Sequence, residues 1–130
     1  MRNILLLFLP GAFIFLYQCQ QSVVCHAPIG NWSGDGQELV FLTDQKGYWI
    51  TQFGSQRDTE SFVFDLDCDH KPPRLDLKDF QSGTNLGKTL FGIIDWQSDT
   101  SFRLQYETGT SSEVRPHEFD NEQIQQFIKK

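Results

Sequence analysis

Residues 87–107, GKTLFGIIDWQSDTSFRLQYE, contain two strand-like runs on either side of a short polar turn. The first run is apolar on both faces in its middle, whereas the second alternates apolar and polar residues as a half-buried strand does. In the second run the apolar positions are Phe102, Leu104 and Tyr106. The polar turn, residues 97–100, is short enough to join two neighbouring antiparallel strands. The stretch therefore predicts a β-hairpin.

Similar runs occupy most of the remaining chain. Two β-branched and aromatic runs surround the turn Asp44-Gln45-Lys46-Gly47, and further alternating runs follow. With a first strand at residues 30–34 and a last one near the C-terminus, the sequence predicts eight short strands, the others being residues 38–43, 47–53, 60–68, 73–79, 87–96 and 101–107. This regular spacing favours an all-β fold, a small eight-stranded antiparallel up-and-down barrel.

The last segment, NEQIQQFIKK, permits two interpretations. Ile124, Phe127 and Ile128 fall at helical spacing behind Asn121, which could cap a helix. A closed barrel, however, needs its last strand to pair with the first, because pairing removes the exposed edges. We therefore expect a closing strand rather than a closing helix.

The N-terminus predicts export from the cytoplasm. Arg2 precedes an uncharged apolar run over residues 4–17, which is typical of a signal peptide and short for a membrane span. We expect a signal peptide over residues 1–25, a barrel domain over residues 26–130 and a secreted or periplasmic location. Residues 16–19, LYQC, have the outline of a lipoprotein box, although Gln18 argues against it; only lipid on Cys19 would bring the chain to a membrane.

The three cysteines leave two arrangements open. A cut before His26 would leave Cys68 as a lone thiol, most often a small buried hydrophobe. A cut between Cys19 and Cys25 would allow Cys25 to pair with Cys68 in an oxidising compartment.

Charge excludes one class of partner. The chain has 11 Lys and Arg against 17 Asp and Glu, and the signal peptide carries only one of these charges, Arg2. Nucleic-acid binding requires clustered basic residues, which are missing from this sequence. The acidity is better interpreted as an aid to solubility.

No sequence pattern predicts catalysis, a cofactor or a metal. Asp65, Asp67, Asp69 and Asp76 have the spacing of a calcium loop, but His70 stands where a glycine is required and prolines interrupt the loop. His26, His70 and His117 match no ligand spacing, and no serine lies in a Gly-x-Ser-x-Gly turn. We therefore expect no enzyme, no cofactor and no metal.

Aromatic residues are abundant after the signal peptide. They could line a pocket at the barrel mouth or simply fill the barrel, and we favour filling because so short a chain needs large side chains in its core. The candidate ligand-binding residues are Tyr48, Trp49, Phe53, Phe62, Phe64, Phe91 and Trp96.

Four motifs in order carry a family resemblance: PIGNW (residues 28–32), KPPRLDL (71–77), LFGIIDWQSDTSFRLQYE (90–107) and VRPHEFDNEQIQQFIKK (114–130). They resemble the small lipocalin-like (calycin-type) domains of secreted bacterial proteins of uncharacterised function. The resemblance implies that Trp32 plugs one end of the barrel and that Arg115 lies over its ring. It gives Gly30, Pro116 and Phe119 the same architectural role.

The combined expectation is a non-enzymatic lipocalin-like protein that binds a small apolar ligand. An alternative is a module that binds an extracytoplasmic protein, such as an inhibitor of a secreted enzyme. In that case polar surface loops, residues 54–59, 81–86 and 108–113, would make the contacts.

Overall fold

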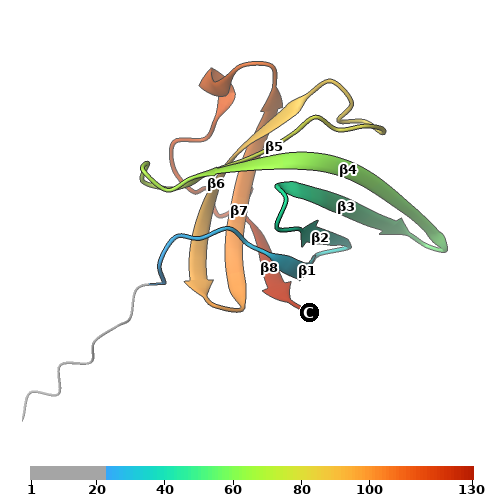
Figure 1. Ribbon diagram of the computed structural model, residues 1–130, viewed down its shortest axis with the longest axis horizontal. Coiled ribbons are helices and arrows are strands. Elements are labelled where there is room, and N and C mark those ends of the chain that lie inside the picture. The colour runs from blue at the N-terminus through green and yellow to red at the C-terminus, as the bar shows by residue number, and fades with distance from the viewer. Residues whose placement is uncertain (1–22) are drawn as a thin grey trace, which may run out of the picture.

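The computed structural model describes residues 23–130 and contains one closed barrel of eight antiparallel strands in sequence order (Figure 1). The predicted fold is confirmed. The strands are β1 (Gly30–Gly34), β2 (Gln37–Phe41), β3 (Lys46–Phe53), β4 (Gln56–Asp67), β5 (Arg74–Lys78), β6 (Thr89–Ser98), β7 (Ser101–Gly109) and β8 (Gln125–Lys129), with one 3-10 turn, η1 (Ser112–Val114). Most of the predicted signal peptide lies outside the described residues.

β8 closes the barrel, as the closing-strand prediction required. It pairs with β7, where Phe102 lies opposite Phe127, and with β1, where Trp32 lies opposite Lys129. The helix-like spacing before it produces only a turn, in which the amides of Gln123 and Ile124 both donate to the carbonyl of Asp120. The strand prevails because it satisfies the two edges that a helix would leave unpaired.

The barrel is filled by its own side chains. Cross-strand partners share a face, and the inner face carries the alternating apolar residues of each strand. Buried phenylalanines dominate this core and pack edge to face, as in the pairs Phe41–Phe62 and Phe41–Phe64. They are Phe41, Phe62, Phe64, Phe80, Phe102 and Phe127. This arrangement agrees with the interpretation that most aromatics build the core.

One end of the barrel, here called the closed end, is covered by the chain before β1. Figure 1 shows this segment crossing β6 and β7. Two indole groups hold it in place. Trp32 Nε1 donates to the carbonyl of Pro28 at 2.7 Å, and Trp96 Nε1 donates to that of His26 at 3.1 Å. Trp32 is itself buried, edge to face against Trp96 and Phe102.

A disulfide bond joins Cys25 to Cys68, just beyond the end of β4. It ties the covering segment to the connection between β4 and β5. Of the two arrangements left open by the sequence, the structure therefore contains the paired one. A signal-peptide cut before His26 would remove this bond, and the position of the cut stays a prediction.

Gly47 in β3 provides a first test of the packing. A Cβ atom at this position would lie 2.5 Å from the carbonyl oxygen of Val40 and 2.5 Å from the Phe62 ring, so the backbone of β2 would have to move. We expect Gly47→Ala to lower the free energy of unfolding by about 1–3 kcal/mol, measured by denaturant titration. Gly109→Ala is the control, because its Cβ would meet only the half-exposed Val114 side chain, which can turn away. Equal losses in both variants would contradict this explanation.

Candidate functional site

The seven candidate aromatics do not converge on one pocket. Phe62 and Phe64 are core residues, Trp96 lies at the closed end with its ring stacked on His26, and Phe91 lies on the outer face beside Arg115. Tyr48 is exposed between two inward-facing neighbours on β3 and therefore points outward. Only Trp49 and Phe53 lie together on the inner face near the other end of the barrel.

That other, open end contains a concavity of about 290 Å³, here called the cup. Its sides are the inner faces of β3 and β4 where they run out into their hairpin, and the loop between β5 and β6 borders it. Figure 1 shows this hairpin projecting beyond the rest of the barrel. The cup is lined by Trp49, Thr51, Phe53, Asp58, Glu60, Thr84 and Asn85.

Trp49 connects the cup to the core beneath it. Its ring lies edge to face against Tyr106 at 5.7 Å and tilted against Phe80 at 6.4 Å. Its Nε1 atom is buried and has no hydrogen-bond partner in the part of the chain that the structure describes. An unpaired buried donor of this kind costs free energy.

A short polar chain lies beside this tryptophan. Gln37 donates to Gln125, and Gln125 donates in turn to the Tyr106 hydroxyl at 3.2 Å. Burial raises the pKa of Tyr106 above its usual value, and the Gln125 hydrogen bond opposes the shift. Tyr106 therefore stays neutral at physiological pH.

Glu60 is held by the loop that borders the cup. Asn85 Nδ2 donates to Glu60 Oε2 at 3.4 Å, and the Gln81 amide donates to the carbonyl of Ser61 at 3.3 Å. Gly83 adopts a φ of +80° and packs so closely on Glu60 that it has no room for a Cβ atom. The Glu60 carboxylate is thus fixed at the edge of the cup instead of moving freely in solvent.

The sequence interpretation missed the polar half of the cup. Asp58 and Glu60 lie opposite Thr51 and Trp49 in the β3–β4 pairing, so both carboxylates share the inner face with the tryptophan. Aligning the two strands about the turn at residues 54–55 would have revealed this pairing. The predicted fourth strand began only at residue 60, because residues 56–59 are polar on both faces.

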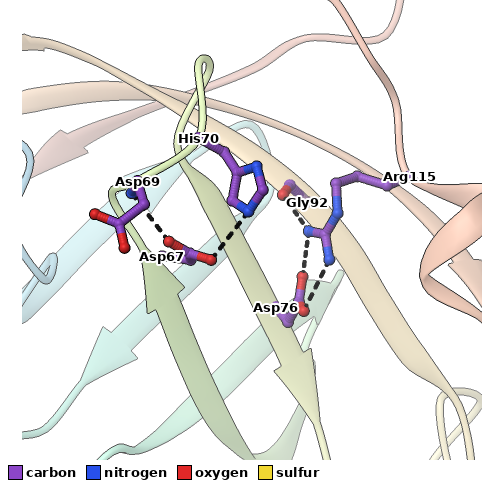
Figure 2. Close-up of polar contacts among 6 residues, drawn as sticks. All are labelled: Asp67, Asp69, His70, Asp76, Gly92 and Arg115. Carbon is purple, nitrogen blue, oxygen red and sulfur yellow. Dashed lines mark hydrogen bonds and ion pairs between the residues drawn. The ribbon is translucent and has the colours of Figure 1, made fainter.

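Arg115 does not cover Trp32, which corrects the expectation drawn from the family resemblance. The guanidinium lies on the outer wall, 5.5 Å from the centre of the Phe91 ring, and pairs with Asp76 through both terminal nitrogens (Figure 2). Its Nη1 also donates to the carbonyl of Gly92 at 2.8 Å. The cation above Trp32 is instead Lys129, 5.8 Å from the ring centre.

The other three residues given an architectural role by the resemblance also lie apart, one at the closed end and two on the outer wall. Gly30 lies at the closed end with a φ of +122° and faces the Lys129 side chain. Pro116 and Phe119 belong to the segment that follows η1, and the Arg103 guanidinium lies 5.3 Å from the Phe119 ring centre. This segment crosses the outer wall, since its Arg115 lies over Phe91 and its Phe119 lies against Arg103, both on the outer face of the sheet.

The acidic candidates do not gather around a common point, and of the three histidines His70 and His117 line one cleft while His26 lies at the closed end. Asp65 pairs with Lys78. Figure 2 shows that Asp67 accepts from the Asp69 amide and contacts His70, and that Asp76 binds Arg115. Within residues 23–130, no group of three His, Cys, Asp or Glu side chains is arranged to hold a metal ion. Over the same residues, no helix has the length and apolar character needed to cross a membrane.

Comparisons with family models, with curated proteins and with solved structures found no match to this chain.

Proposed function

We propose that the protein is a non-enzymatic binding protein that takes a small ligand in the cup, and that this ligand combines an apolar ring with a positive charge. One observation carries the proposal: two aromatic side chains, Trp49 and Phe53, share a concavity with two carboxylates, Asp58 and Glu60. The apolar ligand expected from the sequence would fit the two aromatic side chains but not the two carboxylates.

The negative charge of the cup is the reason for proposing a positive charge on the ligand. Among the described residues that line it there is no Lys, Arg or His to neutralise the two carboxylates. A cationic group there would gain charge-assisted hydrogen bonds to the carboxylates. The ring of the same ligand could stack on the Trp49 indole. Cups at the mouths of β-barrels are common ligand sites, and a volume of about 290 Å³ suits a small molecule.

An extracytoplasmic location belongs to the same proposal. The signal-like N-terminus supports it. With a cut before Cys25 instead of before His26, the Cys25–Cys68 bond supports it as well, because disulfides persist mainly in oxidising compartments.

Three probes of equal ring size test the charge requirement: phenethylamine, phenethyl alcohol and phenylacetate. Titrations followed by proton–nitrogen NMR use the Trp49 indole N–H as the reporter, assigned through Trp49→Phe. We expect phenethylamine to shift this signal saturably and to bind at least about tenfold more tightly than the alcohol, which corresponds to about 1.4 kcal/mol. Phenylacetate is expected to bind most weakly, because the carboxylates repel it.

Two variants locate the charge. Asp58→Asn and Glu60→Gln are each expected to remove most of the preference for the amine while leaving the alcohol nearly unaffected. Asp99→Asn is the matched control, because Asp99 is an exposed carboxylate in the β6–β7 turn at the closed end. Equal binding of all three probes, or a preference that survives both substitutions, would refute a cationic ligand.

One observation favours the protein-binding alternative. Phe53, next to the first loop proposed for that role, and Leu86, the last residue of the second, are 73% and 60% exposed. A defined extracellular partner that binds the wild-type protein but not Leu86→Ser, with no response of Trp49 to any of the three probes, would favour this function instead.

A further inference from the structure

We infer that a second, separate cleft on the outer wall binds a small oxyanion, such as a phosphate group. The cleft lies between the β4–β5 connection and the segment that follows η1, and has a volume of about 70 Å³. Five basic side chains line it: His70, Lys71, Arg74, Arg115 and His117. This inference is independent of the cup, which lies between the β3–β4 hairpin and the β5–β6 loop at the other end of the barrel.

The cleft differs in charge from the chain around it. The whole protein has a formal net charge of −6, yet no Asp or Glu is among the described residues that line this cleft. His70 contacts Asp67 and Arg115 pairs with Asp76, as Figure 2 shows. Lys71 and Arg74 make no ion pair within residues 23–130, so their positive charge remains available, and His117 can add a ring N–H donor.

Arg115 supplies the second, independent observation. Its side chain is only 7% exposed, and its Nε atom has no hydrogen-bond partner among the described residues. The terminal nitrogens are held by Asp76 and by the Gly92 carbonyl, which fixes the orientation of the planar group. An unsatisfied donor on a buried charged group is costly, and an oxyanion accepts hydrogen bonds of this kind strongly.

Size limits the ligand. A volume of about 70 Å³ corresponds to about two water molecules, which is enough for a phosphate or carboxylate group but not for a nucleotide. A larger molecule could bind only by placing one anionic group in the cleft. Pro72 and Pro116 stiffen the backbone on the two sides, so the lining is largely preformed.

Inorganic phosphate is the first probe, titrated at neutral pH while sodium chloride keeps the ionic strength constant. The reporter is the Nε–H signal of Arg115 in proton–nitrogen NMR spectra. We expect a saturable shift of this signal and of the His117 amide. Acetate and phenyl phosphate, titrated in the same way, separate a carboxylate site, a free-phosphate site and a site for the phosphate of a larger molecule.

Two variants test the lining while keeping the Arg115–Asp76 pair. We expect Arg74→Gln and His117→Gln each to weaken phosphate binding by about fivefold or more, because each removes a hydrogen bond or a charge from the anion. Arg57→Gln is the matched control, since Arg57 is an exposed arginine near the β3–β4 hairpin. A linear, unsaturable shift, or equal binding by all four proteins, would show general screening and overturn the inference.

Two of the cup variants distinguish the absence of a phosphate site from the absence of a ligand site in the cup. Asp58→Asn and Glu60→Gln lie outside the cleft and are expected to leave phosphate binding unchanged. A loss of phosphate binding in these two variants would contradict a site at Arg115.

Discussion

Asp76→Ala is expected to lower the free energy of unfolding by about 3–5 kcal/mol, because it leaves the buried Arg115 guanidinium without its counter-charge. The Arg115 side chain is 7% exposed and that of Asp76 22%, so water cannot replace the carboxylate fully. Denaturant titration monitored by tryptophan fluorescence measures the loss. Asp65→Ala is the control: the Asp65–Lys78 pair is half exposed, and exposed pairs contribute about 0–1 kcal/mol.

A second substitution distinguishes the contribution of the Arg115–Asp76 pair to stability from the cost of leaving Arg115 buried without a partner. Replacing both residues, as in Asp76→Ala with Arg115→Met, removes the unpaired charge and keeps much of the side-chain volume. We expect the double variant to be more stable than Asp76→Ala alone, because an apolar replacement of a buried pair is often near neutral. A double variant less stable than the single one would mean that the Gly92 carbonyl and the Phe91 ring, rather than charge pairing, hold Arg115.

The contact between Arg115 and Asp76 is also an example of what the sequence alone did not predict. The alternation in β7 predicted correctly that Phe102 and Leu104 face inward, and hydrophobic periodicity of this kind decides the barrel. The segment after β7 has no such periodicity, so its path along the outer wall could not be read from it. Arg115 was consequently assigned to the wrong side of the wall.

The candidate site, too, was predicted from the sequence only in part. The sequence suggested Trp49 and Phe53 because aromatic residues stand out, and the cup does contain both. Asp58 stood in a polar run that was interpreted as a loop and Glu60 stood at the start of the predicted strand, and only the register of β3 against β4 brings them opposite Thr51 and Trp49. Composition indicates which residue types are present, whereas cross-strand pairing decides which of them meet.

The closed end provides the second large effect. Trp32→Ala is expected to lower the free energy of unfolding by about 3–5 kcal/mol, because a fully buried indole leaves a cavity that its neighbours refill only in part. Those neighbours, Trp96 and Phe102, are themselves held by strand pairing and cannot collapse inward freely. The loss is measured by denaturant titration, with circular dichroism as the signal because the fluorescence of one tryptophan is removed.

Two further variants separate the parts of this contribution. Trp32→Phe keeps most of the ring but loses the hydrogen bond to the Pro28 carbonyl, so we expect a smaller loss of about 1–3 kcal/mol. Lys129→Ala removes only the exposed cation above the ring, worth about 0.5–1 kcal/mol. If Lys129→Ala cost as much as Trp32→Ala, the end would be closed mainly by the cation. A small effect of Lys129→Ala beside a large one of Trp32→Ala would show that packing of the indole closes the barrel.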